Sequence, residues 1–296
     1  MSAEYLTQQF VNALGLGAIY ALLALGLAIV FNVLGLLNFA YGELITVTGY
    51  TMFFLAPVMG LWPSAVVGMG SAIILSLIIQ LVAFRPLRGA PAHVVIFASF
   101  AVSILIQALI RNVISPRPKG IAVPSWLDNV WVVGSFHFPV LSIITFVVAM
   151  VAMIGLTAFL GRTKQGLAIR AAAEDFSITR LMGVSADRMV VLAFALSGLL
   201  AGIAGILWIA RTGSVAPSMG FNPLLQSFIA VVLGGFGSLR AAIAGGFALA
   251  FIEVSLQSFL PNDLVPFTAA LTLVVVVAVL YFRPQGFSKL TPERVA

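Results

Sequence analysis

Two carboxylates, Glu43 and Glu253, stand inside long apolar stretches of this chain and are well placed to carry chemistry. A carboxylate within a membrane is costly and usually faces a cavity or a partner, so each could line a path for a polar solute. Glu43 has a slightly favoured alternative, the first turn of a helix, where the helix dipole and interfacial water stabilise an anion. For Glu253 a buried hydrogen bond between two helices is an equally good explanation.

Patterns that support catalysis or nucleotide binding are missing. The sequence contains neither the G-x-x-x-x-G-K-[ST] pattern of a phosphate-binding loop nor the H-E-x-x-H pattern of a zinc protease. Its only histidines, His93 and His137, fall in different regions, and the absence of cysteine excludes disulfides and thiolate metal sites. We therefore expect no catalytic residue, no metal site, no cofactor and no enzymatic activity.

A glycine cluster (GGFGS, residues 234–238) interrupts the apolar sequence. A run of this kind can cradle a phosphate, but no lysine follows it and its flanks are typical of membrane spans. A broken helix or a re-entrant turn is the better interpretation, because such breaks occur where backbone is buried in protein or lines a cavity. The uncharged Gln226 precedes the cluster, and structural hydrogen bonding is the favoured role for it.

Composition places the chain in a membrane. Of its 296 residues, 61% are hydrophobic and 8% are charged, against about 25% charged in a soluble domain. Because a spanning helix needs about 20 apolar residues, we expect an all-α polytopic membrane protein with about eight transmembrane helices. The predicted spans are roughly residues 10–31, 39–55, 64–84, 92–110, 138–160, 190–210, 241–260 and 267–282, with residues 223–233 as a half-helix or re-entrant segment. In the sixth span, Gly198, Gly202 and Gly205 are spaced for close helix packing.

Positive charge predicts the orientation of these spans, because cytoplasmic loops carry an excess of Lys and Arg. With residues 161–188 placed inside, only Arg111, Arg117, Lys119 and Arg211 of the 15 basic residues fall outside. The N-terminus is therefore expected outside and the C-terminus in the cytoplasm. The net charge of +6 indicates contact with anionic membrane lipid rather than with nucleic acid.

Residues 161–188 form a polar island between two predicted spans. A helix is expected over residues 165–173. Asp175 is placed to cap a short helix over residues 176–182, which Gly183 would end, and Ser185 is placed to cap the next span. Such an ordered segment is suited to docking, and the alternative is a positive loop that only sets topology. The residues alone leave both open.

Several motifs resemble one family of transporters. They are LLNFAYGELITVTGY (residues 36–50), FRPLR (84–88), IRAAAEDFSITRLMGV (169–184), VLGGFGSLRAAIAGG (232–246) and FRPQG (282–286). In order, and over almost the whole chain, they resemble the permease subunits of branched-chain amino-acid ABC importers of the LivH type. One departure is Tyr41, where the family often has histidine; the tyrosine keeps an aromatic donor and removes a titratable group.

The resemblance implies a single permease domain over residues 1–296, in the inner membrane of a bacterium. Such a permease translocates branched-chain or related small amino acids, which a periplasmic solute-binding protein delivers. Further expected partners are two cytoplasmic ATPase subunits, which bind the ATP, and a second permease subunit, either related or another copy. Urea, short amides or small carboxylates are alternative substrates within the same class.

The resemblance also assigns roles to particular residues. Each permease of such an importer presents a cytoplasmic coupling helix to an ATPase, and here that helix would span residues 174–183. The expected docking residues are Glu174, Asp175, Arg180, Met182 and Gly183. From the residues themselves rather than from the resemblance, we expect Asn38, Tyr41, Glu43, Gln226 and Glu253 to line a translocation path.

Two other classes of transporter stay possible on the sequence. A secondary transporter that works alone would need Glu43 or Glu253 as its coupling carboxylate. A passive channel would have no use for an ordered docking segment.

Overall fold

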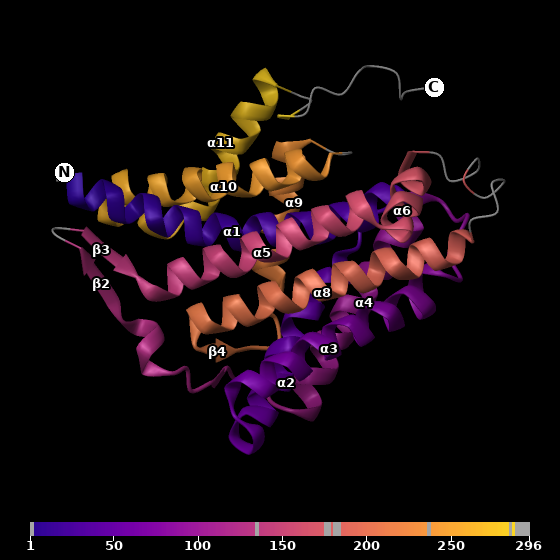
Figure 1. The fold of residues 1–296 in the computed structure, drawn as a ribbon, viewed down its shortest axis with the longest axis horizontal. Coiled ribbons are helices and arrows are strands. Elements are labelled where there is room, and N and C mark those ends of the chain that lie inside the picture. The colour runs from indigo at the N-terminus through magenta and orange to yellow at the C-terminus, as the bar shows by residue number, and fades with distance from the viewer. Residues whose placement is uncertain are drawn as a thin grey trace. The chain divides into compact units, whose positions relative to one another are not determined.

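The computed structural model describes residues 3–133, 136–174, 179, 185–235, 238–283 and 286–287 of the chain. Over these residues the chain is built almost entirely from helices (Figure 1), which confirms the predicted all-α class. The α-helices are α1 (Ala3–Leu34), α2 (Gly42–Met59), α3 (Leu61–Ile79), α4 (Ala92–Val113), α5 (Val140–Arg162), α6 (Lys164–Glu174), α8 (Ala186–Thr212), α9 (Phe221–Gly234), α10 (Leu239–Phe259) and α11 (Thr268–Phe282).

Short elements lie in the connections between these helices. The tight or wide helical turns are η1 (Phe39–Tyr41), η2 (Gln80–Phe84), η3 (Ser125–Asp128) and η4 (Asn262–Phe267). The antiparallel strand pairs are β1 (Lys119–Gly120) with β4 (Ser214–Val215), and β2 (Val130–Val133) with β3 (Phe136–Pro139). In the second pair Trp131 lies opposite Phe138, so β2 and β3 form a small hairpin just before α5.

Eight helices within the described residues are long and apolar enough to cross a membrane, as the sequence predicts. Some observed helices extend past the predicted spans; α1 begins at Ala3 instead of residue 10. A helix can continue beyond the hydrocarbon core because its backbone hydrogen bonds are internal. The short segment is also present: α9 has 14 residues, about 21 Å at 1.5 Å per residue, which is less than the roughly 30 Å of a hydrocarbon core.

The predicted break at the glycine cluster lies between α9 and α10. Helix α9 ends at Gly234, and Gly235 has a positive φ of 99°, a conformation that favours glycine. Ser238 then caps α10, because its Oγ accepts a hydrogen bond from the Ala241 N–H at 3.3 Å. The break is therefore a feature of the local backbone and its cap.

Contacts between residues divide the chain into two compact units. Unit 1 comprises Met1–Ala28, Pro124–Met150 and Gln226–Ala296, and unit 2 comprises Ile29–Val123 and Val151–Leu225. In unit 1, α10 packs closely on α1: a Cβ added at Gly17 would lie 3.1 Å from the Cα of Phe247, and one added at Gly246 would meet the backbone of Ala21. Glycine permits this approach because small residues let helix backbones come together in a membrane.

Helices α2, α3 and α8 pack together in unit 2. Added Cβ atoms at Gly198 and Gly202 of α8 would lie 2.9 Å from backbone Cα atoms of α3, those of Ile73 and Met69. Ser76 of α3 donates a hydrogen bond of 2.7 Å to the carbonyl oxygen of Phe194 in α8. The glycine spacing read from the sequence thus marks a close helix contact, as predicted.

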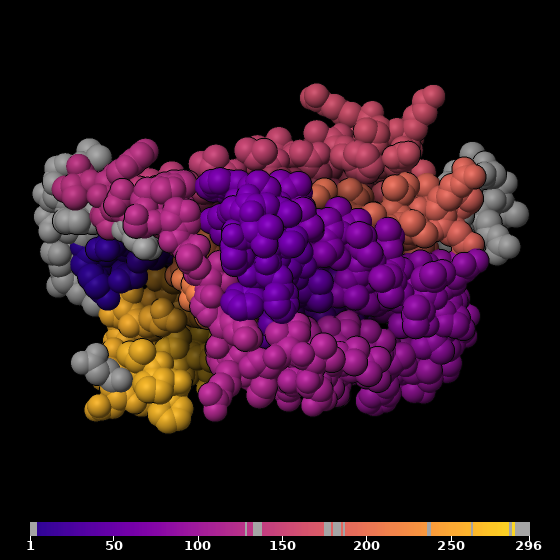
Figure 2. Space-filling view, turned by 90° about the horizontal axis from the view of Figure 1, so that it is seen from below, coloured from indigo at the N-terminus to yellow at the C-terminus, as the bar shows by residue number. Residues whose placement is uncertain are grey.

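Helix α4 is a further spanning helix of unit 2. One side of it carries exposed apolar side chains, including Phe97, Ile104, Leu105 and Leu109. In the space-filling view this region lies on an open face, coloured magenta to purple (Figure 2). Exposed apolar side chains on a spanning helix are suited to contact with lipid, and four polar side chains of α4 belong to the site described next.

Candidate functional site

The junction between α1 and α2 is a break in the helical backbone. After α1 ends, Gly35 takes a positive φ of 67° and the chain runs without helix to Asn38. The Asn38 side chain caps η1, because its Oδ1 accepts a hydrogen bond from the Ala40 N–H at 3.0 Å. The Phe39 N–H donates to Ser99 Oγ of α4 at 3.1 Å. Backbone groups freed by a break within a membrane need partners, and here a local cap and α4 supply them.

Glu43 lies in the first turn of α2, as expected, but it is buried rather than in interfacial water, with 1% of its surface exposed. Its Oε1 accepts hydrogen bonds from Ser103 Oγ and Gln107 Nε2 of α4, each of 2.8 Å. Its Oε2 has no hydrogen-bond partner among the described groups. One carboxylate oxygen therefore ties α2 to α4, and the other is an acceptor without a donor among the described groups.

The partners of this segment form a polar stripe on α4 that the sequence reasoning missed. Its members recur every four residues, so they share one face of the helix, and they are Ser99, Ser103, Gln107 and Arg111. Arg111 extends the network, since its Nη2 donates to Gln107 Oε1 at 3.5 Å. A search of the fourth predicted span for polar residues at helical spacing would have found the stripe.

The first turn of α2 also meets the turn that precedes α9. A Cβ added at Gly42 would lie 2.5 Å from the carbonyl oxygen of Gly220, so the two backbones approach as only glycine allows. The Gly220 N–H donates to Thr46 Oγ1 at 3.3 Å. The start of α2 is thus held by α4 and by the turn before α9, all within unit 2.

Three of the five predicted path residues share this segment: Asn38, Tyr41 and Glu43. Asn38 and Tyr41 are buried, and the Tyr41 hydroxyl has no hydrogen-bond partner among the described groups. Buried polar atoms are normally paired, so those that are not call for a ligand, a water or a second conformation. Chemically, the segment presents a hydroxyl and a carboxylate oxygen that could accept hydrogen bonds from a polar solute.

The other two predicted path residues belong to unit 1. Glu253 of α10 accepts a hydrogen bond of 2.9 Å from the Tyr20 hydroxyl of α1, which is a contact between helices. Gln226 of α9 has a buried Oε1 with no partner among the described groups. The structure therefore brings Asn38, Tyr41 and Glu43 together and places Gln226 and Glu253 in a different unit.

The polar island begins as predicted: the helix expected over residues 165–173 is present as α6. Glu174 ends α6 and is exposed. The other expected docking residues, Asp175, Arg180, Met182 and Gly183, lie outside the described residues. Ser185 directly precedes α8, although its side chain makes no capping hydrogen bond.

Asp187 lies in the first turn of α8 and forms an ion pair with Arg88. Helix α6 packs against α8. Within unit 2, the end of the polar island is therefore joined to the loop that contains Arg88, and α6 at its start packs against α8.

Within the described residues, no group of three or more His, Asp or Glu is placed to hold a metal ion.

A family model and individual relatives place the chain in the same protein family. The model of a family described as "Branched-chain amino acid transport system / permease component" matches residues 9–283. The high-affinity branched-chain amino acid transport system permease protein LivH of Escherichia coli is 30% identical over 95% of each chain. The corresponding permease protein BraD of Pseudomonas aeruginosa is 35% identical over 94% of each chain. A ribose import permease protein, RbsC of Escherichia coli, is 26% identical over 83% of this chain and 77% of its own.

Proposed function

The chain belongs to the family of permease components of branched-chain amino acid transport systems, and on that premise we propose that it is the membrane subunit of an ATP-driven importer. Its cargo is a branched-chain or related small amino acid. The observation that carries the proposal is the family match. It covers, in whole or in large part, all eight helices of the described residues that are long and apolar enough to cross a membrane. The chain does not hydrolyse ATP itself, because its sequence has no phosphate-binding loop.

The proposed assembly supplies what the chain lacks. Two cytoplasmic ATPases bind the nucleotide, a second permease subunit (a relative or another copy) completes the path, and a periplasmic binding protein delivers the solute. The complex lies in the inner membrane of a bacterium. Similarity to a ribose import permease supports a sugar as a second candidate cargo. If the cargo is a sugar, the periplasmic binding protein selects the solute.

The path runs past the start of α2. When the helices around the start of α2 move apart, the Tyr41 hydroxyl and Glu43 Oε2 become available to the polar groups of the solute. Asn38 stabilises the break before α2 by capping η1. Gln226 and Glu253 are further path residues of this proposal. A carboxylate suits an amino-acid cargo because a protonated amine donates charge-assisted hydrogen bonds to it.

Coupling to ATP enters through residues 174–183, which dock on an ATPase through Glu174, Asp175, Arg180, Met182 and Gly183. Packing within unit 2 supports transmission from this segment: α6 contacts α8, and α8 contacts α2, whose first turn carries Glu43. An ATPase can drive the cycle only if its grip differs between the outward-facing and inward-facing states. We propose that docking of residues 174–183 on the ATPase differs between those two states.

Uptake of labelled leucine by cells that make the whole complex tests the proposal. We expect uptake to stop when ATP is depleted while the proton gradient is kept intact. Accumulation by the reconstituted chain without an ATPase would contradict the proposal and favour a secondary transporter. Downhill leucine flux through the chain alone would indicate a channel.

Variants of the docking segment sharpen the same experiment. Glu174→Lys and Gly183→Phe should lower leucine uptake while the ATPase subunits still hydrolyse ATP, because the grip on the permease is lost. Lys164→Glu, a charge reversal at the first residue of α6, is the matched control and should transport normally. Normal uptake in the first two variants would refute the assignment of the coupling segment.

A further inference from the structure

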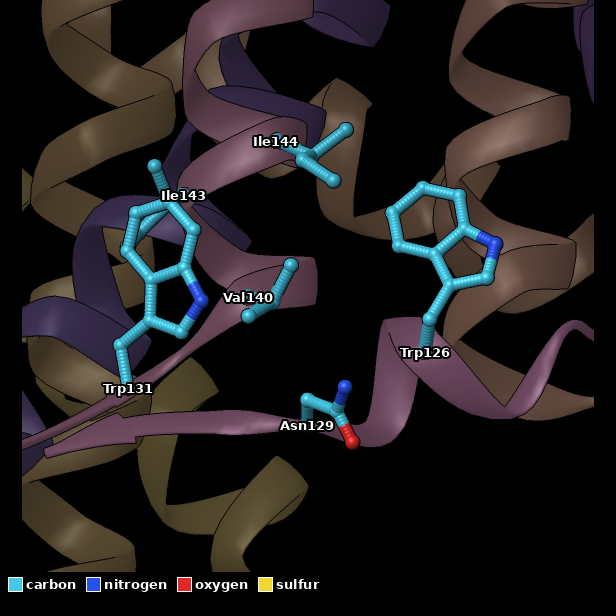
Figure 3. Close-up of a pocket in the computed structure, with 6 residues that line it drawn as sticks. All are labelled: Trp126, Asn129, Trp131, Val140, Ile143 and Ile144. Atoms are coloured by element: carbon cyan, nitrogen blue, oxygen red, sulfur yellow. The ribbon is translucent and has the colours of Figure 1, made fainter.

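A small cavity lies beside the β2–β3 hairpin, at the start of α5 in unit 1. It has a volume of about 230 Å³, and its lining consists of Trp126, Asn129, Trp131, Val140, Ile143 and Ile144. Figure 3 shows the two indole rings on either side of Val140, with Ile143 and Ile144 beyond it and Asn129 toward the hairpin. The cavity is therefore an apolar slot between two indoles, with one amide at its edge.

The hairpin beside the slot turns apolar side chains outward. Trp131 is 61% exposed, and its neighbours Val130 and Val132 in β2 are exposed as well. A strand that faces water on one side normally alternates apolar and polar residues, and β2 does not. An exposed apolar patch of this kind marks a contact surface rather than a surface built for water.

The residues that α5 contributes to the slot indicate which kind of partner contacts this surface. Val140 is the first residue of α5, and Ile143 and Ile144 belong to its first turns, so the slot lies where a membrane-spanning helix begins. Further along α5, Val147 and Val148 are exposed and continue the apolar surface. No lysine or arginine occurs between Lys119 and Arg162. Tryptophans at the ends of spanning helices lie at the level of the lipid headgroups, because the indole joins a large apolar ring to one N–H donor.

We propose that this slot binds an acyl chain of a membrane phospholipid, and that the β2–β3 hairpin lies in the interfacial layer of the bilayer. The indoles of Trp126 and Trp131 flank the acyl chain, and the isoleucines of α5 contact its methylene groups. The Asn129 amide lies at the polar end, where it can donate a hydrogen bond to an ester oxygen of the lipid. Lipid binding at this site does not depend on the proposed transport function.

Tryptophan fluorescence tests the site directly, since the chain has only four tryptophans. Trp62→Phe and Trp208→Phe are combined with either Trp126→Phe or Trp131→Phe, which leaves one reporter at the slot. The full-length variants are reconstituted in phosphatidylcholine vesicles with brominated or unbrominated acyl chains. We expect brominated lipid to quench both reporters and aqueous iodide to leave them nearly unchanged. Quenching by iodide without quenching by brominated lipid would place the hairpin in water and overturn the proposal.

Two further variants, one that fills the slot and one beside it, distinguish lipid inside the slot from lipid on the surrounding surface. Ile144→Phe fills the slot and should remove much of the quenching of Trp126 by brominated lipid. Val147→Phe, on the exposed side of α5 outside the slot, is the matched control and should leave the quenching as it was. Equal quenching in the two variants would mean that lipid touches the hairpin without entering the slot, and resistance to both quenchers would mean that protein covers it. Either result would refute the proposal.

Discussion

The two oxygens of the Glu43 carboxylate have different surroundings. Oε1 accepts from Ser103 and Gln107, whereas Oε2 has no partner among the described groups. A buried carboxylate is stabilised by its donors, and removing one of them leaves an uncompensated polar group in an apolar medium. The same residue can thus hold α2 against α4 and still offer an acceptor to a solute.

The hydrogen bond from Gln107 can be tested by a stability measurement. Gln107→Leu should destabilise the purified protein by about 1–3 kcal/mol, because the Glu43 carboxylate loses a donor in a buried site. Thermal unfolding in detergent, followed by circular dichroism, measures the loss. Gln257→Leu makes the same chemical change at an exposed position of α10 and should cause no destabilisation. An equal, small effect of both substitutions would show that the bond to Glu43 contributes nothing.

At the scale of elements, glycines decide where two helices can approach closely. The spacing of Gly198 and Gly202 predicts close packing of α8, and the structure identifies α3 as the partner. The same holds at Gly42, whose neighbour Gly220 is far away in the sequence. A repeat of small residues predicts a contact surface but not the helix that covers it.

A bulky side chain at this contact should force α8 and α3 apart. We expect Gly202→Leu to lower the unfolding free energy by about 1–3 kcal/mol or more, the usual cost of overpacking, since even a Cβ there meets the backbone of Met69. Gly155→Leu in α5 is the matched control, because among the described residues nothing beyond the adjacent backbone of α5 lies within 4 Å of a Cβ added at Gly155. Yield and thermal midpoint after purification are the measurements. A normal Gly202→Leu protein would disprove the tight contact.

At the scale of the whole molecule, the orientation of the chain depends on α9. Eight crossings alone would return the chain to the side on which it started, so termini on opposite sides require the short helix to belong to a ninth crossing. Basic residues favour that topology, because only four of the 15 then fall outside. The break between α9 and α10 is therefore part of the predicted topology.

Fusion reporters test this orientation. A reporter that is active only outside the cytoplasmic membrane should be silent at the C-terminus and active when inserted after Lys119, in the loop that is expected outside. The physical basis is the retention of positively charged loops in the cytoplasm. The insertion at Lys119 serves as the positive control. Activity of the C-terminal fusion would contradict the predicted topology and remove α9 from the count of crossings.

The sequence by itself determined the number of spans, the short segment, the break at the glycine cluster and the helix that opens the polar island. A bilayer demands a minimum apolar length and internal satisfaction of the backbone, so these features are written locally in the chain. Only the tertiary structure decided that Glu43 meets Ser103 and Gln107, that Gly42 meets Gly220, and that two tryptophans enclose a slot. The first two pairings join residues far apart in the sequence, and the slot joins the hairpin region to the start of α5. All three depend on which faces of the elements meet, which a single amphipathic or apolar segment does not encode.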